Sequence, residues 1–531
     1  MNAVTLPLLR GQISQEDALE ADRDIIQQLS YPEKRIDFYL YLYQHRSEIA
    51  QVLSRHLGIP TNDFRLGEVE EWLHGSFNVC LPIYIGTGRG PLLPRRVILR
   101  LPLPYKVGES FHPGNVDEKL RCEAATYIRL QSQHPAVPIP RLFGFGFPGT
   151  QSFTLYENET LWNRITWFWR RGLAWLHGES LPLYFAHARH GLFDVGYLVI
   201  EHVDEGVMLS ATWNEEHYDP IKRANLFHSL SRIILDLARL PLPRIGSWTM
   251  DDRGILTLTN RPLTFCIHEM ENNGIPTALP RDLTYMSIES YYLDLIACHD
   301  ERIRRQPNSI HDQDDGERQL AALTGMRTLL PKFTDRRSHG KPFILSLTDL
   351  HQSNIFVDND WHVKRIIDLE WACSQPIQML NLPHWLVGKG VDQLTGSCLD
   401  EYKAVYDEFL YALEEEEALS GELSNTCSKT IRENWSTGRN WYLFALAHSD
   451  ALWSVFSDHI QPRFGEFNGE SDKAIMQLWD EGASEFVSSK VAEQELYNIR
   501  ICEMFARAAA RDADSREVDD AEGNDKCDST E

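Results

Sequence analysis

The sequence predicts an α+β fold of two lobes, in which a small β-rich lobe precedes a large, mostly helical lobe. Short β-branched and aromatic runs, separated by turn residues, dominate from residue 64 to about residue 203. Helical periodicity dominates after residue 204, apart from a few short strands between residues 343 and 368. A chain of 531 residues, 43% of them hydrophobic, is large enough for such a two-lobed domain with additions.

Composition predicts a division into four segments. Residues 1–63 form a helical extension, because the run DFYLYLYQHRSEIAQVLSRHLG has apolar positions at helical spacing and ends at Gly58 and Pro60. Residues 64–203 form the β-rich lobe and residues 204–510 the helical lobe. Residues 511–531 are polar and acidic, with no large apolar residue, which predicts a disordered tail.

Within the β-rich lobe, the runs GEVEEWL, NVCLPIYI, RRVILRLP, PRLFGFG and YLVIEHV predict strands. The run DEKLRCEAATYIRLQ, residues 117–131, predicts a helix. Residues 157–191 interrupt this pattern with an insertion rich in Trp, Arg and His. Two interpretations of the insertion remain open, a packed helical insert or an amphipathic surface that touches a membrane or a substrate.

The bulk charge limits the classes of partner. The net charge of −25 predicts no nucleic-acid partner, because an acidic surface repels phosphate backbones. No uncharged apolar run approaches the ~20 residues that a membrane span needs, and no secretory signal is recognisable. The nine cysteines have no C-x-x-C spacing, which favours buried or free thiols in a reducing compartment. We therefore expect a cytoplasmic protein without an obligate protein partner.

The residues that point to chemistry lie between Thr348 and Trp371. Asp349 and Asn354 flank a short loop between two predicted strands, in the pattern D-x-x-x-x-N, and Asp368 ends the second strand of a predicted hairpin. The two ends of a hairpin lie together, so Asp368 is expected to return beside the loop. Carboxylate and amide oxygens suit Mg²⁺, which leaves Asp349 to accept a proton from a substrate hydroxyl. The alternative is a set of ordinary hairpin turn residues.

The β-rich lobe carries further residues in the order that a kinase needs. Gly75, Ser76 and Phe77 form a turn that can cover phosphates. Arg100 is a cation on the third strand, and Glu123 on the helix can hold that cation. Each feature alone is common, but their order along the chain favours a kinase-like nucleotide site.

These residues lie in a sequence that resembles the fungal branch of the aminoglycoside phosphotransferase and choline kinase-like superfamily. The resemblance covers residues 68–385 and is most specific in TDLHQSNIFVD and IIDLEWA, which are similar to HGDLHPSNILVD and IIDWEWA of the family. EAATYIRL, VPIPRLFGFG, LPLPRIGSW, NRPLT and LPHWL add to it. The resemblance implies a bilobal protein kinase-like fold.

The resemblance also implies roles for individual residues. Asp349 would be the catalytic aspartate and His351 a residue that braces its loop. ATP is the implied co-substrate and Mg²⁺ the implied metal, with a small-molecule hydroxyl as acceptor. The implied metal ligands are Asn354, Asp368 and Glu370. Backbone groups of a hinge that runs from Ile200 through Glu201, His202 and Val203 would meet the adenine.

Two departures from the family pattern leave a second function open. Leu347 stands where the family has the His of HGD, and Arg100 stands where it commonly has Lys. The chain is therefore predicted to be a small-molecule kinase, or else a kinase-shaped nucleotide-binding protein with little or no turnover. A protein kinase is disfavoured, because Leu-Glu follows Asp368 in place of Phe-Gly and no A-P-E element is present. The acidic balance favours a cationic acceptor such as an amine or amino sugar.

Overall fold

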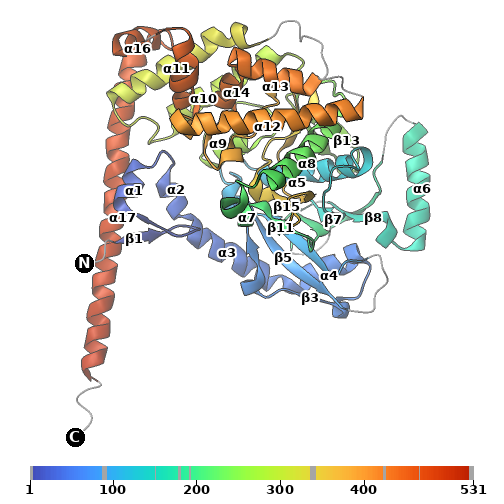
Figure 1. Cartoon of the computed structure of the whole chain (residues 1–531). Coiled ribbons are helices and arrows are strands. Elements are labelled where there is room, and N and C mark those ends of the chain that lie inside the picture. The colour runs from blue at the N-terminus through green and yellow to red at the C-terminus, as the bar shows by residue number, and fades with distance from the viewer. Residues whose placement is uncertain are drawn as a thin grey trace. The chain divides into compact units, whose positions relative to one another are not determined.

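The chain divides into two compact units (Figure 1). Unit 1 gathers residues 1–40, 299–325 and 467–531, and unit 2 contains residues 41–298 and 326–466. The computed structural model describes residues 4–86, 93–149, 151–176, 181–189, 193–334, 343–421, 426–465 and 467–525. The protein is mixed α/β, with a β-rich N-terminal region and a helical C-terminal part.

An eight-stranded sheet forms the β-rich part of unit 2. Its strands follow the order β3-β5-β6-β10-β7-β8-β9, with β4 paired to β5, and every pairing is antiparallel. The strands are β3 (Phe64–Leu66), β4 (Leu73–His74), β5 (Asn78–Ile85), β6 (Arg96–Pro102), β7 (Leu142–Gly146), β8 (Gln151–Leu155), β9 (Tyr184–Ala188) and β10 (Tyr197–Glu201). Helix α5 (Asn115–Gln133) contacts β7 and β10 of this sheet.

Most predicted strands of the sheet are confirmed. Runs such as NVCLPIYI form strands because they bury β-branched and aromatic side chains in the sheet. The run GEVEEWL is an exception. Residues Val69–Glu71 form a 3-10 turn, because Glu68 and Glu71 close a reciprocal capping box around it. The predicted insertion contributes β9, which pairs with β8 and extends the sheet by one strand.

Helices make up most of the rest of unit 2. They include α4 (Arg46–Leu57), α6 (Leu161–Leu176), α7 (Leu209–Glu216), α8 (Pro220–Arg239), α9 (Phe265–Asn272), α12 (Gly396–Ser420), α13 (Thr426–Thr437), α14 (Arg439–Ala447) and α15 (Leu452–Val455). Helices α3 (Tyr31–Gln44), α10 (Ile288–Arg305) and α11 (Gln313–Phe333) begin in one unit and end in the other. The α8–α12 pair is fixed by the rings of Phe227 and Phe409, whose centroids lie 5.1 Å apart.

Three small sheets position the region around Asp349. Strand β14 (Ile344–Leu347) pairs with β17 (Ala372–Gln375), and β12 (Ser247–Met250) pairs with β13 (Leu256–Asn260). The third sheet has the order β11-β15-β16, with β11 at Val207–Met208, β15 at Ile355–Val357 and β16 at Val363–Ile366. The loop that holds Asp349 and Asn354 therefore begins at β14 and ends at β15.

Unit 1 is assembled from segments that are distant in sequence. It contains β1 (Thr5–Pro7), β2 (Gln12–Ser14), α1 (Gln15–Glu20), α2 (Ile25–Leu29), α16 (Gly469–Met476) and α17 (Ala483–Asp525). Ile25 packs with Tyr497, Ile501 and Phe505 in its core. The predicted division of the chain into consecutive segments does not anticipate this assembly.

Helix α17 runs through part of the predicted disordered tail. The backbone is helical to Asp525, and residues 526–531 lie outside the described part of the chain. The sequence AAARDADSREVDDAE contains several good helix formers, and extension of an existing helix adds a hydrogen bond per residue without a new nucleation cost. No helix among the described residues is both long and apolar enough to span a bilayer.

Candidate phosphotransfer site

The predicted hairpin after Asn354 is confirmed. Strands β15 and β16 pair antiparallel, with Ile355 opposite Ile366. The next pair along the hairpin is closed by the Ile367 N–H, which donates to the Asn354 carbonyl at 2.9 Å. Asp368 follows directly, so the chain brings its backbone back to the loop as the spacing predicts.

Asn354 links this hairpin to Asp349. The Nδ2 group of Asn354 donates to the Asp349 carbonyl at 2.9 Å and to the Asp349 carboxylate at 3.3 Å. Asn354 is buried, which fixes the orientation of the amide. The two ends of the D-x-x-x-x-N motif therefore contact each other through a side chain as well as through the loop.

Several side-chain hydrogen bonds hold the loop that follows Leu347. The Thr348 hydroxyl donates to the Trp371 carbonyl at 2.6 Å, and the Trp385 indole N–H donates to the Leu350 carbonyl at 2.8 Å. His351 caps the short 3-10 helix Gln352–Asn354 by accepting the Ser353 N–H at 3.2 Å. Its Nε2 lies 3.7 Å from the Asp349 carboxylate, so His351 braces the loop and makes no hydrogen bond to Asp349.

The environment of Asp349 favours a carboxyl that titrates near neutrality. Burial raises its pKa to about 7, and the negative charge of Glu370 adds to the rise. The hydrogen bond from Asn354 and the charge of Arg100 act in the opposite direction. A carboxyl with this pKa is matched to proton transfer at neutral pH.

Asp349→Asn is expected to gain stability relative to the wild type as the pH rises from about 5 to 8. The carboxyl has its ordinary pKa of 3.8 when exposed, so the folded state keeps a proton that the unfolded state has lost. The wild type therefore loses stability up to about pH 7, by roughly 2 kcal/mol, while the neutral amide does not. Urea unfolding at both pH values measures the difference. A difference that does not change with pH would contradict the raised pKa, and Asp360→Asn serves as an exposed control.

Asp368 has an unusual backbone conformation. Its φ of 66° lies in the left-handed region, which Asp tolerates better than most residues but still at a cost of about 1 kcal/mol or more. Its carboxylate is 28% exposed and forms an ion pair with Arg100, which reaches it from β6. The strand cation and the residue at the end of the hairpin thus come together, whereas residue order predicted only the pairing of Arg100 with Glu123.

A buried charge cluster surrounds the Arg100 side of this pair. Arg100 lies 2.8 Å from the Glu370 carboxylate and 3.4 Å from that of Glu123. Lys119, one turn before Glu123 on α5, forms an ion pair with Glu370 and lies 3.5 Å from Glu123. Asn78, the first residue of β5, accepts from Lys119 at 2.8 Å and donates to Glu370 at 2.9 Å.

The cluster distributes its charge unequally. Burial opposes ionisation of Glu370, but Lys119 and Arg100 hold its pKa well below the ordinary value. Burial raises the pKa of Glu123, because it outweighs the same two cations. Glu370 is therefore the ionised centre of the cluster, and the cations that it holds face Asp368 and Glu123.

Asp368 and Asn354 keep ligand atoms that fit a Mg²⁺ ion. Asp368 offers a partly exposed carboxylate, and Asn354 uses its Nδ2 on Asp349, which leaves its Oδ1 without a donor among the described residues. One carboxylate oxygen each of Glu123, Asp368 and Glu370 lie within 4.8 Å of one another. Glu370, however, is fully buried between two cations and is not open to a hydrated ion.

The predicted phosphate turn lies between β4 and β5. The Gly75 N–H donates to the Asn78 carbonyl at 2.9 Å, and Ser76 is exposed. The Phe77 ring meets the Trp371 ring edge-on, with centroids 4.8 Å apart. The turn is thereby attached to the residue that follows Glu370.

The predicted hinge joins the sheet to the hairpin. The Glu201 N–H donates to the Arg141 carbonyl at 2.8 Å, and the Glu201 carboxylate accepts the Arg141 N–H at 3.1 Å. His202 Nδ1 lies 2.9 Å from the Asp204 carboxylate, and Val203 is half-buried. The chain then enters β11, which pairs with β15, so the hinge connects directly to the strand after Asn354.

Two residues of the cluster are absent from the sequence-based prediction. Neither Lys119 nor Asn78 is among the predicted site residues, although Asn78 ends the predicted turn that begins at Gly75. The i, i+4 spacing of Lys119 and Glu123 on a predicted helix was a visible signal. The partner Glu370 was not predictable, because the ion pair joins residues 251 positions apart.

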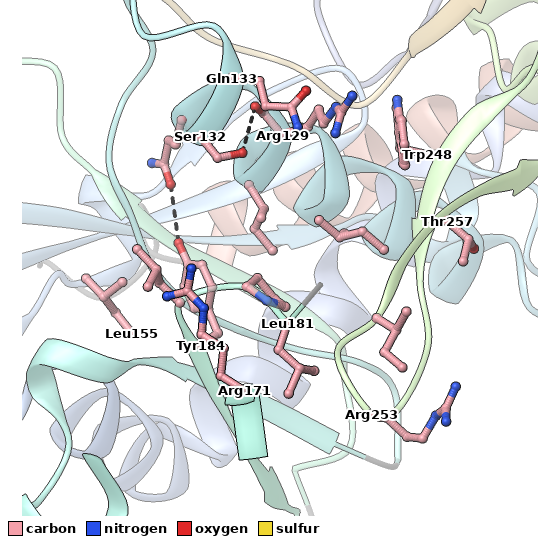
Figure 2. A pocket seen from close by; sticks show the side chains of 16 residues that line it. Arg129, Ser132, Gln133, Leu155, Arg171, Leu181, Tyr184, Trp248, Arg253 and Thr257 are labelled. Atoms are coloured by element: carbon pink, nitrogen blue, oxygen red, sulfur yellow. Dashed lines mark hydrogen bonds between the residues drawn. The ribbon is translucent and has the colours of Figure 1, made fainter. Parts of the chain in front are cut away.

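A cavity of about 700 Å³ lies apart from these residues, between the C-terminal end of α5, residues 181–184 and the β12–β13 hairpin (Figure 2). Its wall combines apolar side chains with Arg129, Arg171 and Arg253. None of the predicted site residues lines it.

Comparisons with known proteins identify no family for the chain. No family model and no curated protein sequence matches the chain. Among solved structures, the chain is similar to a macrolide 2'-phosphotransferase type I, with 12% sequence identity over 80% of this chain and 97% of that one. The TM-score of 0.29 is too low to establish a shared fold.

Proposed function

We propose that the protein is a small-molecule kinase of protein kinase-like fold, which transfers the γ-phosphate of ATP to a hydroxyl group. The contacts from Ile367 to Asn354 and from Asn354 to Asp349 carry this proposal. They bring Asp349, Asn354 and Asp368 together on one loop and one hairpin, which supports roles for them as base, amide ligand and carboxylate ligand. Arg100 brings the sheet to the same group.

The proposed reaction assigns one role to each residue. Asp349 accepts the proton of the acceptor hydroxyl while the hydroxyl oxygen bonds to the γ-phosphorus. The bond from that phosphorus to the β–γ bridging oxygen breaks, which releases ADP. Asn354 and Asp368 would hold Mg²⁺, which when bound would neutralise charge on the phosphates. Arg100 would hold the Asp368 carboxylate beside the phosphates through their ion pair, and the turn from Gly75 to Phe77 would cover the phosphates.

Glu370 and Lys119 have a positioning role in this proposal. Glu370 holds Arg100 at 2.8 Å and Lys119 in an ion pair, and a pKa kept low by these cations keeps it ionised. The hinge residues Glu201 to Val203 offer backbone groups to the adenine. The buried cluster thus fixes the strand cation relative to the hairpin.

The proposal is tested by incubation of the purified chain with γ-labelled ATP, Mg²⁺ and a metabolite extract. Label that appears in a small molecule supports the kinase and identifies the acceptor. Binding of Mg²⁺ and ATP without any transfer, over a broad panel of acceptors, would contradict it.

One observation favours a second function, a kinase-shaped nucleotide-binding protein without turnover. The Asp368 carboxylate is engaged by Arg100, a cation that competes with a metal for the same oxygens. The contacts of Thr348 and Trp385 favour the enzyme, because they brace the loop where the histidine is missing.

Asp368→Asn is expected to abolish Mg²⁺-dependent nucleotide binding, because the amide removes the charged ligand. The melting temperature is expected to stay near that of the wild type, since the lost ion pair with Arg100 is partly exposed and Arg100 retains Glu370. Calorimetric titration with ATP, with and without Mg²⁺, measures the effect. Unchanged binding would refute the metal role, and Asp360→Asn in the exposed hairpin turn is the control.

A further inference from the structure

Helix α6 presents an apolar face to solvent. Trp167 and Ala174 are its only residues that are buried, whereas Trp162, Trp169 and Trp175 are 78%, 74% and 76% exposed. Further apolar side chains on the same face are exposed, namely Ile165, Phe168 and Leu173. At 100° per residue, these positions occupy an arc of roughly 160° around the helix. Figure 1 shows α6 at the edge of unit 2.

The opposite side of α6 is already anchored. The Trp167 ring stacks on Tyr156 with centroids 5.2 Å apart, and its N–H donates to the Pro182 carbonyl at 3.2 Å. The Arg171 guanidinium lies over the Trp167 ring at 5.1 Å. The helix thus has a partner on its inner side, and the exposed face is a second apolar surface that this contact leaves open.

The charge of α6 is opposite to that of the whole chain. The helix carries Arg164, Arg170 and Arg171 and no acidic residue, in a protein with a net charge of −25. The helical spacing puts these arginines on both flanks of the apolar arc. Arg170 and Arg171 have no carboxylate partner among the described residues. A partner that covers this face must therefore be apolar at its centre and anionic at its rim.

We propose that α6 is an interfacial helix that lies in the surface of an anionic membrane. Its indole rings would sit at the boundary between headgroups and acyl chains, and its arginines at the level of the phosphates. A second copy of the chain is a poorer occupant, because its arginine rims would face like charge. The helix is about 24 Å long and lies along the membrane surface.

The cavity beside α6 supports an anionic lipid. Arg171 belongs to both features, and the cavity wall adds Arg129, which lies over the Trp248 ring at 4.3 Å (Figure 2). Leu181 and Leu183 supply apolar surface in the same wall. Positive charge and apolar side chains are thus continuous from the flank of the helix into the cavity.

Co-sedimentation of the full chain with vesicles tests the proposal. The wild type is expected to bind vesicles of phosphatidylcholine with phosphatidylserine and to bind phosphatidylcholine alone much more weakly. The double change Trp162→Asp and Trp169→Asp is expected to abolish binding. Arg170→Gln with Arg171→Gln is expected to weaken binding roughly twenty-fivefold, at about fivefold for each arginine.

Leu419→Asp on α12 is the matched control, because Leu419 is 81% exposed and lies on another helix. It is expected to bind as the wild type does. All variants are expected to have the melting temperature of the wild type, because the changed side chains are exposed. Failure of the wild type to bind phosphatidylserine vesicles, or equal binding to phosphatidylcholine, overturns the proposal. So does a wild-type dimer in light scattering that the tryptophan changes convert to a monomer, since the face would then cover a second copy.

Discussion

Asp349→Asn is expected to reduce γ-phosphate transfer about a thousandfold, because it removes the proposed base while keeping the shape of the side chain. The amide cannot take the hydroxyl proton, but Asn354 can still contact the backbone carbonyl of residue 349. Binding of Mg²⁺ and ATP is expected to persist, since Asn354 and Asp368 are unchanged. Label transfer from γ-labelled ATP measures the rate, and calorimetry measures the binding.

The pH dependence gives this prediction a second readout. Asp349 has a pKa of about 7 and must be ionised to accept a proton, so wild-type transfer is expected to rise with pH through this range. The residual activity of Asp349→Asn is expected to lack that rise. Asp360→Asn, an exposed change in the nearby hairpin turn, is expected to behave as the wild type. Wild-type rates in Asp349→Asn would show that another group accepts the proton.

Lys119→Met is expected to destabilise unit 2 by about 3–5 kcal/mol. The change leaves the buried carboxylates of Glu370 and Glu123 with one cation in place of two, and Asn78 loses the donor of its 2.8 Å hydrogen bond. Loss of one partner from a buried ion pair exposes the full desolvation cost of the other. Urea unfolding followed by tryptophan fluorescence measures the effect.

Two comparisons separate this effect from the loss of any lysine. Lys222→Met removes the more exposed ion pair of Lys222 with Glu216 and is expected to cost about 1 kcal/mol or less. The double change Lys119→Met with Glu370→Gln is expected to cost less than the sum of the single changes, because it removes both charges. A loss below about 1 kcal/mol in Lys119→Met would contradict the buried network.

The local features of the fold were predictable from the sequence. The helix over residues 117–131, the strands around residues 78–85 and 95–102, and the hairpin after Asn354 follow from periodicity and turn residues, and the structure confirms them. The pairing of Arg100 with Glu123 also followed from residue order, whereas its pairing with Asp368 did not. These contacts depend on elements that each carry a clear pattern.

Features that depend on distant partners were not predictable in this way. The ion pair of Lys119 with Glu370 and the packing of Ile25 against Tyr497 leave no pattern within either segment. Glu370 was predicted as a metal ligand from its position in the motif. Its burial between Arg100 and Lys119 is visible only in the structure. A 3-10 turn forms at Val69–Glu71, where a strand was predicted, because the side-chain hydrogen bonds of the capping box at Glu68 compete with strand pairing.

Transfer of the γ-phosphate by the wild type and by Asp349→Asn, in the same metabolite extract with Mg²⁺ and γ-labelled ATP, is the most direct test of the proposed kinase. The proposal predicts one labelled small molecule with the wild type, and at least a hundredfold less of it with the variant although both bind ATP. Absence of label with a wild type that binds Mg²⁺ and ATP, or equal labelling by the two proteins, would contradict it.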